Sequence, residues 1–134
     1  MKVTGEFHVK LQPMDFSAKG DDGINFGRMS IDKTFSGALE ATSKGEMLSA
    51  MTATKGSAGY VALEQVSGSL SGKKGSFVLQ HFGTMSRGKD ILVLELIPDS
   101  GSGELSGISG KMSIKMENGA HLYEFEYDLV PNKN

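Results

Sequence analysis

The amino-acid sequence predicts an all-β domain that folds as a single small antiparallel β-barrel of about eight strands. Apolar and polar residues alternate along most of the chain, which is the periodicity of strands with one buried face. Turn sequences rich in Gly, Asn, Asp and Ser separate these stretches, and no helical periodicity extends over the length of a helix. Glycines inside the expected strands favour the sharp bends of a small barrel over a sandwich: Gly37, Gly68, Gly107 and Gly110.

The first strand is expected at residues 2–11, where Val3 and Phe7 belong to an apolar set that alternates with polar residues. This alternation puts His8 on the polar face of the strand, directed away from the core. A loop follows, because residues 20–23 read Gly-Asp-Asp-Gly, a composition typical of turns.

A hairpin is expected over residues 35–54, with its turn at Ser43-Lys44-Gly45. A change of one residue in that loop moves every following side chain to the other face of the sheet. The pattern therefore leaves open whether Met47 or Leu48 points inward.

A clearer hairpin surrounds Gly72-Lys73-Lys74-Gly75, and pairing its two glycines places Glu64 opposite Gly83 and diagonal to His81. The face taken as inward holds most of the large side chains together with an acid and an imidazole: Tyr60, Ala62, Glu64, Val66, Leu70, Phe77, Leu79 and His81. The other face is partly apolar, which we expect to mark a subunit interface: Val61, Leu63, Val78 and Phe82.

The C-terminal third is expected to hold one strand covered on both faces and a final hairpin. Residues 91–97 are almost continuously apolar, which predicts the covered strand. The hairpin turns at Asn118-Gly119, a pair favoured where both turn residues need positive φ. This turn makes four inward pairs: Met116 with His121, Ile114 with Tyr123, Met112 with Phe125, and Gly110 with Tyr127. Lys111 faces Glu126 on the other side, so one register produces an apolar interior and a charge-paired exterior.

Composition limits the class of protein. With 134 residues the chain is expected to form one domain, residues 1–134, around a single core. A formal net charge of −2 argues against a general nucleic-acid binder. Cysteine is absent, which excludes disulfides and thiolate metal sites and fits a cytoplasmic protein. Neither a signal-peptide core nor an apolar run long enough for a membrane span is visible.

Four segments carry a resemblance to one bacterial family: Gly56–Glu64, Gly75–His81, Ser100–Gly110 and His121–Tyr127. Over roughly residues 1–130 the chain resembles the bacterial domain-of-unknown-function family 3224. The resemblance implies a small antiparallel barrel like that of allene oxide cyclase and dirigent proteins. The family has no assigned activity, and the glutamate on which the cyclase depends is not matched here. A cyclase reaction would therefore rest on shared fold alone.

Glu64 and His81 are the candidate catalytic residues. Charged residues are seldom buried unless they are paired, so an inward carboxylate beside an imidazole is notable. Together the two groups could accept and donate protons in an enclosed site, as an isomerisation requires. The alternatives are a structural hydrogen bond between two buried polar groups, or a face assignment that puts both in solvent.

Five further residues are expected to line a ligand site in the same interior: Tyr60, Phe77, Leu79, His121 and Tyr123. A tyrosine hydroxyl can orient a bound carbonyl by hydrogen bonding. The alternative is ordinary barrel core whose hydroxyls bond to the backbone. Because His121 follows the last turn directly, it is expected at a barrel end.

Neither a metal nor a cofactor is expected. His8, His81 and His121 share no ligand spacing, and His8 points away from the core. The glycines of residues 101–110 are not followed by the Gly-Lys-Ser/Thr of a phosphate loop.

Three hypotheses follow for the function. The first is a barrel that binds a small apolar or carbonyl-bearing molecule in its cavity. The second is a cofactor-independent isomerase or cyclase that uses Glu64 and His81 as acid and base. The third is a structural or assembly module whose barrel is filled by its own side chains. A homo-oligomer, dimer or trimer, is compatible with each of them, and neither nucleic acid nor membrane is an expected partner.

Overall fold

The computed structural model describes residues 1–130, and every regular element in that range is a β-strand. The strands are β1 (Lys2–Met14), β2 (Asn25–Gly37), β3 (Leu39–Met51), β4 (Ala58–Leu70), β5 (Lys73–Ser86), β6 (Lys89–Leu96), β7 (Ser102–Gly103), β8 (Ile108–Glu117) and β9 (Ala120–Leu129). Within the same residues there is no helix that could span a membrane.

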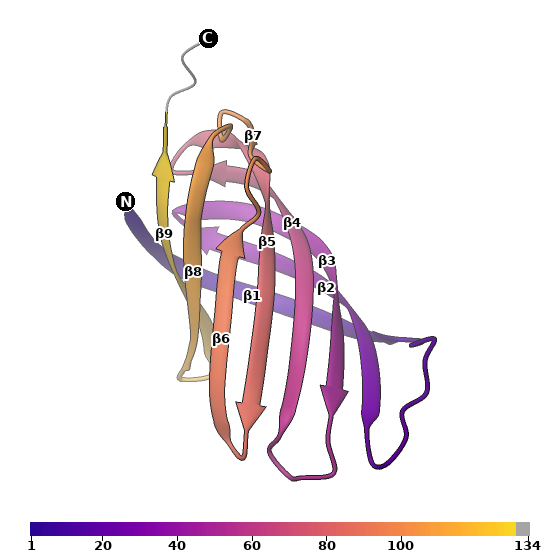
Figure 1. The fold of residues 1–134 in the computed structure, drawn as a ribbon. Helices are drawn as coiled ribbons and strands as arrows, with labels where there is room; N and C mark the ends of the chain where they lie inside the picture. The colour runs from indigo at the N-terminus through magenta and orange to yellow at the C-terminus, as the bar shows by residue number, and fades with distance from the viewer. Residues whose placement is uncertain (131–134) are drawn as a thin grey trace.

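Eight of the strands close into an antiparallel barrel (Figure 1), which confirms the predicted fold class. The strands run in the order β1–β2–β3–β4–β5–β6–β8–β9, and β9 pairs with β1 to complete the ring. The short β7 adds two residues to the end of β5. The ring is weakest between β6 and β8, which pair only at Leu94–Met112 and Glu95–Lys111, whereas the other neighbouring strands of the ring pair over longer stretches.

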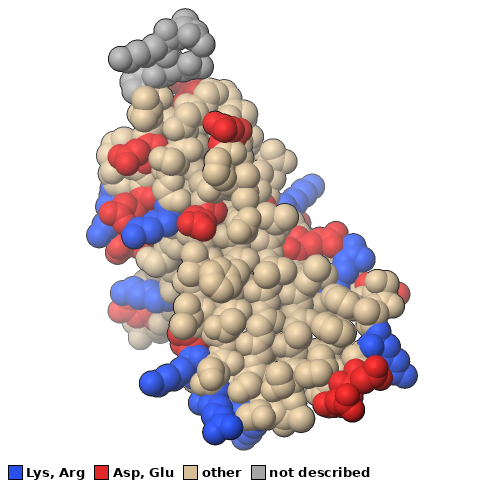
Figure 2. Space-filling model, viewed as in Figure 1, with Lys and Arg blue, Asp and Glu red and all other residues tan. Residues whose placement is uncertain are grey.

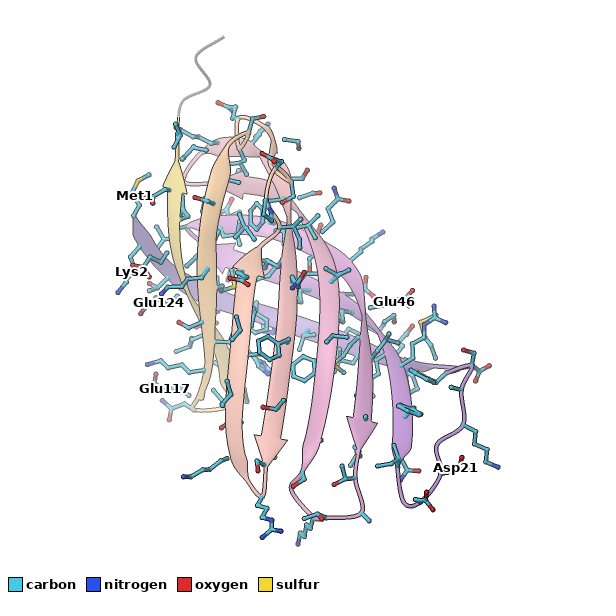
Figure 3. All side chains as sticks on the ribbon, in the orientation of Figure 1. Met1, Lys2, Asp21, Glu46, Glu117 and Glu124 are labelled. Atoms are coloured by element: carbon cyan, nitrogen blue, oxygen red, sulfur yellow. The ribbon has the colours of Figure 1, made fainter. Side chains whose placement is uncertain are left out.

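The exterior of the barrel carries charges that pair across neighbouring strands. Lys2 on β1 lies 3.3 Å from the carboxylate of Glu124 on β9, and both side chains project outward (Figure 3). Lys111 and Glu126 form a similar exposed pair on β8 and β9. Exposed pairs of this kind stabilise a fold only weakly, but they keep this side of each strand in solvent.

The turn between β8 and β9 has the geometry that its sequence predicts. Asn118 and Gly119 both have positive φ, 51° and 80°, as a type I′ turn requires. The predicted register of the hairpin, with Met112 opposite Phe125, is confirmed throughout. A two-residue turn therefore determined which side chains of the last two strands face the interior.

The predicted register of the β4–β5 hairpin is wrong. The turn residues are Ser71 and Gly72, with φ of 48° and 87°, rather than the two lysines that follow. Glu64 consequently pairs with Leu79 and not with Gly83. A turn at the lysines would force two long side chains into the left-handed region, whereas glycine adopts it freely. Because the register moved by an even number of residues, every side chain keeps its predicted face.

The hairpin expected to turn at Ser43-Lys44-Gly45 is also wrong. The chain turns at Gly37, whose φ is 104°, and β3 runs without interruption through the Ser-Lys-Gly segment. A Cβ on Gly45 would lie 1.9 Å from the carbonyl oxygen of Leu63, so this glycine marks a close approach of two strands. The register also settles that Met47 points inward and Leu48 outward.

The barrel is tightly packed at the end near β7 and the C-terminus. There the inward side chains of the long strands, together with Leu105 from the turn before β8, form one buried cluster: Phe7, Phe35, Leu39, Ala41, Val66, Leu70, Phe77, Leu79, Leu94, Leu96, Leu105, Ile108, Met112, Tyr123, Phe125 and Tyr127. Three aromatic rings contact one another in tilted arrangements along it, with the Phe125 centroid 5.5 Å from that of Phe77 and 5.2 Å from that of Tyr127. Side chains therefore fill this half.

The opposite end, at the β3–β4 and β5–β6 turns, is open. Met51, Met85, Leu92 and Met116 occupy inward positions of their strands, yet they are 39–60 % exposed. Leu94, the next inward residue of β6, is only 2 % exposed. We call the inward-facing side chains of this end the mouth: Met29, Met47, Met51, Tyr60, Met85, Leu92 and Met116.

Candidate functional site

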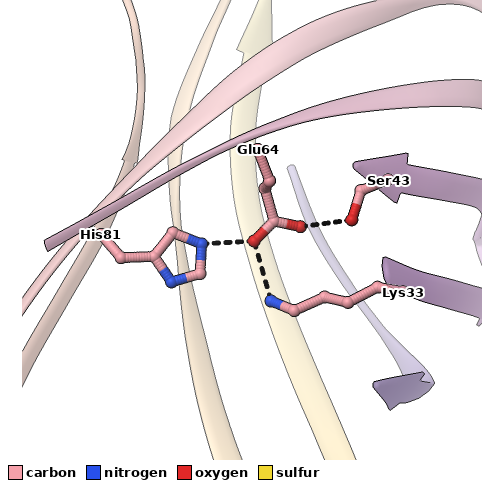
Figure 4. Close-up of polar contacts among 4 residues, drawn as sticks. All are labelled: Lys33, Ser43, Glu64 and His81. Atoms are coloured by element: carbon pink, nitrogen blue, oxygen red, sulfur yellow. Dashed lines mark hydrogen bonds and ion pairs between the residues drawn. The ribbon is translucent and has the colours of Figure 1, made fainter. Parts of the chain in front are cut away.

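Glu64 is a buried carboxylate in the barrel interior, only 1 % exposed. The alternation of β4 turns it inward between Ala62 and Val66, which are both buried. Its carboxylate accepts hydrogen bonds from Lys33 Nζ at 2.8 Å, from Ser43 Oγ at 2.7 Å and from His81 Nε2 (Figure 4). The predicted contact between Glu64 and His81 is thus present.

Four successive strands supply the four polar residues. Lys33 lies on β2, Ser43 on β3, Glu64 on β4 and His81 on β5. Lys33 and Ser43 are direct cross-strand partners, and the other two join them diagonally across the curved sheet. We call Lys33, Ser43, Glu64 and His81 the polar quartet, and each of them is buried.

The quartet keeps Glu64 ionised. Burial alone raises the pKa of the carboxyl group, but the hydrogen bond from His81 and the positive charge of Lys33 act in the opposite direction. The resulting pKa is about 2, against an ordinary value of 4.5. Glu64 is therefore a carboxylate at every physiological pH, and its contact with His81 requires the hydrogen on Nε2.

Aromatic rings complete the surroundings of the buried ammonium. Lys33 Nζ lies 5.0 Å from the ring centroid of Phe7 and 5.8 Å from that of Phe35. Both distances suit cation–π attraction, which is stronger where water is excluded. In residues 1–130 no fully buried side-chain nitrogen or oxygen lacks a hydrogen bond. The quartet is consequently a satisfied network that fits the interior as it stands.

Comparison with known proteins places the chain in a family. The family model described as "Protein of unknown function (DUF3224)" matches residues 3–127. The chain belongs to the DUF3224 family. The crystal structure of a DUF3224 protein of unknown function from Shewanella oneidensis MR-1 superposes with a TM-score of 0.95. Its sequence is 60 % identical, and the alignment covers 98 % of both chains. No curated protein matches the chain.

These findings confirm the predicted family and the predicted barrel, but they assign no activity to DUF3224 proteins. The function must therefore be argued from the quartet and from the surfaces around it.

Tyr60 and His121 lie toward the mouth of the DUF3224 barrel. Tyr60 lies four residues before Glu64 on the same inward face of β4 and is half-buried. Burial and the nearby charge of Glu64 both raise the pKa of Tyr60. The half-buried ring of His121 lies with its centroid 5.0 Å from that of Phe7. Both side chains are thus placed between solvent and the quartet.

The other three residues expected to contact a ligand lie in the packed core. Phe77 and Leu79 are fully buried, and Tyr123 is 2 % exposed. The Tyr123 hydroxyl accepts a hydrogen bond from the Leu39 backbone N–H at 3.0 Å and donates one to the Ser36 carbonyl at 2.9 Å. Both hydrogen bonds of this hydroxyl are therefore made with the backbone. This is the arrangement expected if Tyr123 belongs to the barrel core and does not contact a ligand.

Sequence reasoning missed Lys33 and Ser43. A signal for Lys33 was available, because Ile31, Lys33 and Phe35 share one face and a cation stands where the pattern requires an apolar residue. A lysine at such a position suggests an inward carboxylate partner elsewhere in the chain. Ser43 had no comparable signal, since its surroundings resemble a turn.

Proposed function

We propose that this DUF3224 barrel binds a small, largely apolar molecule in its mouth. One observation carries the proposal: Met51, Met85, Leu92 and Met116 face inward at the open end but are 39–60 % exposed. Natural barrels either fill such space or keep it for a ligand. An exposed apolar wall that leads to a buried polar group has the arrangement of a binding pocket.

The lining indicates the class of ligand. Five of the seven mouth side chains are methionines, which are flexible and adapt to ligands of varied shape. Deeper in the barrel than the outermost methionines lies the hydroxyl group of Tyr60. Farther along the same face is Glu64, which positions the Lys33 ammonium and the His81 imidazole by hydrogen bonds. A ligand with an apolar body and one terminal carbonyl or carboxylate would match this order of groups.

The isomerase hypothesis has less support. An effective general base has a pKa near the working pH, and the pKa of Glu64 is about 2. Its oxygens already accept three hydrogen bonds. Glu64 is better suited to positioning Lys33 and His81 than to removing a proton from a substrate.

The test is a titration with the neutral fluorescent probe N-phenyl-1-naphthylamine. We expect saturable binding with one probe per barrel. Leu92→Lys, which places a charge in the mouth, should raise the Kd at least tenfold. Ile91→Lys is the matched control, because the neighbouring residue faces outward on the same strand and is 63 % exposed.

Two results would overturn the proposal: no saturable binding to the wild-type barrel, or equal loss of binding in the two lysine variants. If the probe does bind in the mouth, native mass spectrometry of protein purified gently from its own host identifies a natural ligand by its mass.

A further inference from the structure

The outer surface of strands β3 to β6 carries a continuous apolar face. Leu48, Val61, Phe82 and Val93 follow one another as direct cross-strand partners, so they form a row perpendicular to the strands. We call this row and its flanking residues the outer apolar face: Leu48, Val61, Leu63, Phe82, Ile91 and Val93. Five of its six side chains are 43–63 % exposed, so no other part of the chain covers this face.

Charges surround this face but do not enter it. Figure 2 shows a broad uncharged area over the front strands of Figure 1, with Lys, Arg, Asp and Glu at its edges. Asp15, Arg28 and Glu46 lie at one edge of this face, and Arg28 pairs with Glu46 through a 2.7 Å hydrogen bond. The row of apolar side chains itself carries no charge, so two copies can bring these rows together without placing like charges at the centre of the contact.

A ridge and a groove lie side by side on this surface. The loop after β1 stacks Phe16 on Phe26, with ring centroids 4.8 Å apart and ring planes within 6° of parallel. Beside this ridge runs a groove of about 610 Å³ that is lined by Leu48, Val61 and Phe82, among others. A second hollow of about 370 Å³ continues it and shares the same three residues.

We propose that the outer apolar face binds a second copy of this chain in a two-fold symmetric dimer. An isologous interface needs a surface that is complementary to itself, and a neighbouring ridge and groove meet that need. Each copy would place its Phe16–Phe26 ridge toward the groove of the other.

The area of the outer apolar face is consistent with binding of a second copy of the chain. Side chains of this kind and exposure present on the order of 500 Å² of apolar surface together, near the upper limit for a patch on a monomer. A standard interface buries about 800 Å² per partner, so this apolar surface would supply more than half of it. A small ligand in the groove alone would leave Ile91 and Val93 uncovered.

Light scattering after size-exclusion chromatography tests the dimer at 10 µM protein. We expect the wild-type chain to have twice the mass of one chain. Phe82→Lys should place two like charges in the centre of the interface and raise the dimer Kd at least a hundredfold, so that this variant is monomeric. Thr4→Lys is the control, since Thr4 is an exposed outward residue on β1, across the barrel.

Val61→Lys provides an independent variant should Phe82→Lys fail to fold, which circular dichroism would show. A wild-type monomer at 100 µM would overturn the proposal, as would a trimer, because a trimer needs two different surfaces. A folded Phe82→Lys or Val61→Lys variant that stays dimeric would overturn it as well.

Discussion

Glu64 depends on its three donors for its place in the interior. A carboxylate taken out of water loses several kcal/mol of solvation, which only close charges and hydrogen bonds offset. Lys33, Ser43 and His81 provide them, and the aromatic rings beside Lys33 stabilise the opposite charge. Removal of one member therefore leaves the others buried without a partner.

The first prediction concerns the stability of the quartet. Glu64→Gln should lower the free energy of unfolding by about 3–5 kcal/mol, because it leaves the Lys33 ammonium buried without a counter-ion. Urea unfolding followed by circular dichroism measures the change. Glu46→Gln is the matched control: that carboxylate pairs with Arg28 on the exposed surface, and its loss should have no measurable effect.

The second prediction concerns pH. The folded-state pKa of Glu64, about 2, lies below the ordinary 4.5, so the unfolded chain takes up this proton first as the pH falls. The stability that Glu64 contributes is complete above pH 4.5 and is lost between about pH 4.5 and pH 2. Melting temperatures of the wild type and Glu64→Gln should therefore converge over this window. A difference in melting temperature between the two proteins that stays constant down to pH 2 would contradict this prediction.

Among the elements, β3 and β4 leave no room for a side chain at Gly45, the cross-strand partner of Glu64. Gly45 pairs with Glu64 across the two strands, and the space above it is occupied by the Leu63 carbonyl. Any side chain at this position would push β3 away from β4. The same displacement would separate Ser43 from the Glu64 carboxylate.

The third prediction compares two glycines. Gly45→Ala should destabilise the barrel by roughly 3 kcal/mol, since the added methyl group meets backbone atoms that cannot move aside. Gly119→Ala should cost only about 1 kcal/mol, because its φ is 80° but no atom lies within 4 Å of the new methyl group. Urea unfolding of both variants measures the difference. If both variants lose the same free energy of unfolding, β3 and β4 can move apart at Gly45 without a large cost, and the prediction is wrong.

At the scale of the whole molecule, strands β3 to β6 present two apolar surfaces that face opposite ways. The inner surface lines the mouth and the outer one forms the outer apolar face. Strict alternation keeps them separate, as at Ile91 and Leu92, which are neighbours in sequence and point to opposite sides. Ligand binding and dimer formation are therefore expected to be independent.

The fourth prediction tests this independence. Phe82→Lys should become monomeric yet bind N-phenyl-1-naphthylamine with a Kd within twofold of the wild type. Leu92→Lys should lose probe binding yet remain dimeric. Light scattering and fluorescence titration on the same preparations measure both properties. A monomeric variant that also loses the probe would show instead that the mouth requires the dimer.

The sequence by itself determined the class of fold and the face on which each side chain lies. Alternation identifies faces because the side-chain period of a strand is two, whatever its partner. The Asn118-Gly119 turn also specified a complete register, because two residues with positive φ accept only one hairpin geometry. For that reason Glu64 and His81 were placed together correctly even though the register of their hairpin was wrong.

Only the tertiary structure decided how these strands meet. Lys33 reaches Glu64 because β2, β3 and β4 align in one particular register, and such long-range pairing leaves no local pattern in the chain. The open mouth likewise depends on the closure of the whole ring: Leu92 and Leu94 share one face, yet only Leu94 is covered. Leu94 lies where β6 pairs with β8 at Met112, whereas Leu92 lies beyond the last pair between these two strands, and alternation within one strand carries no information about that.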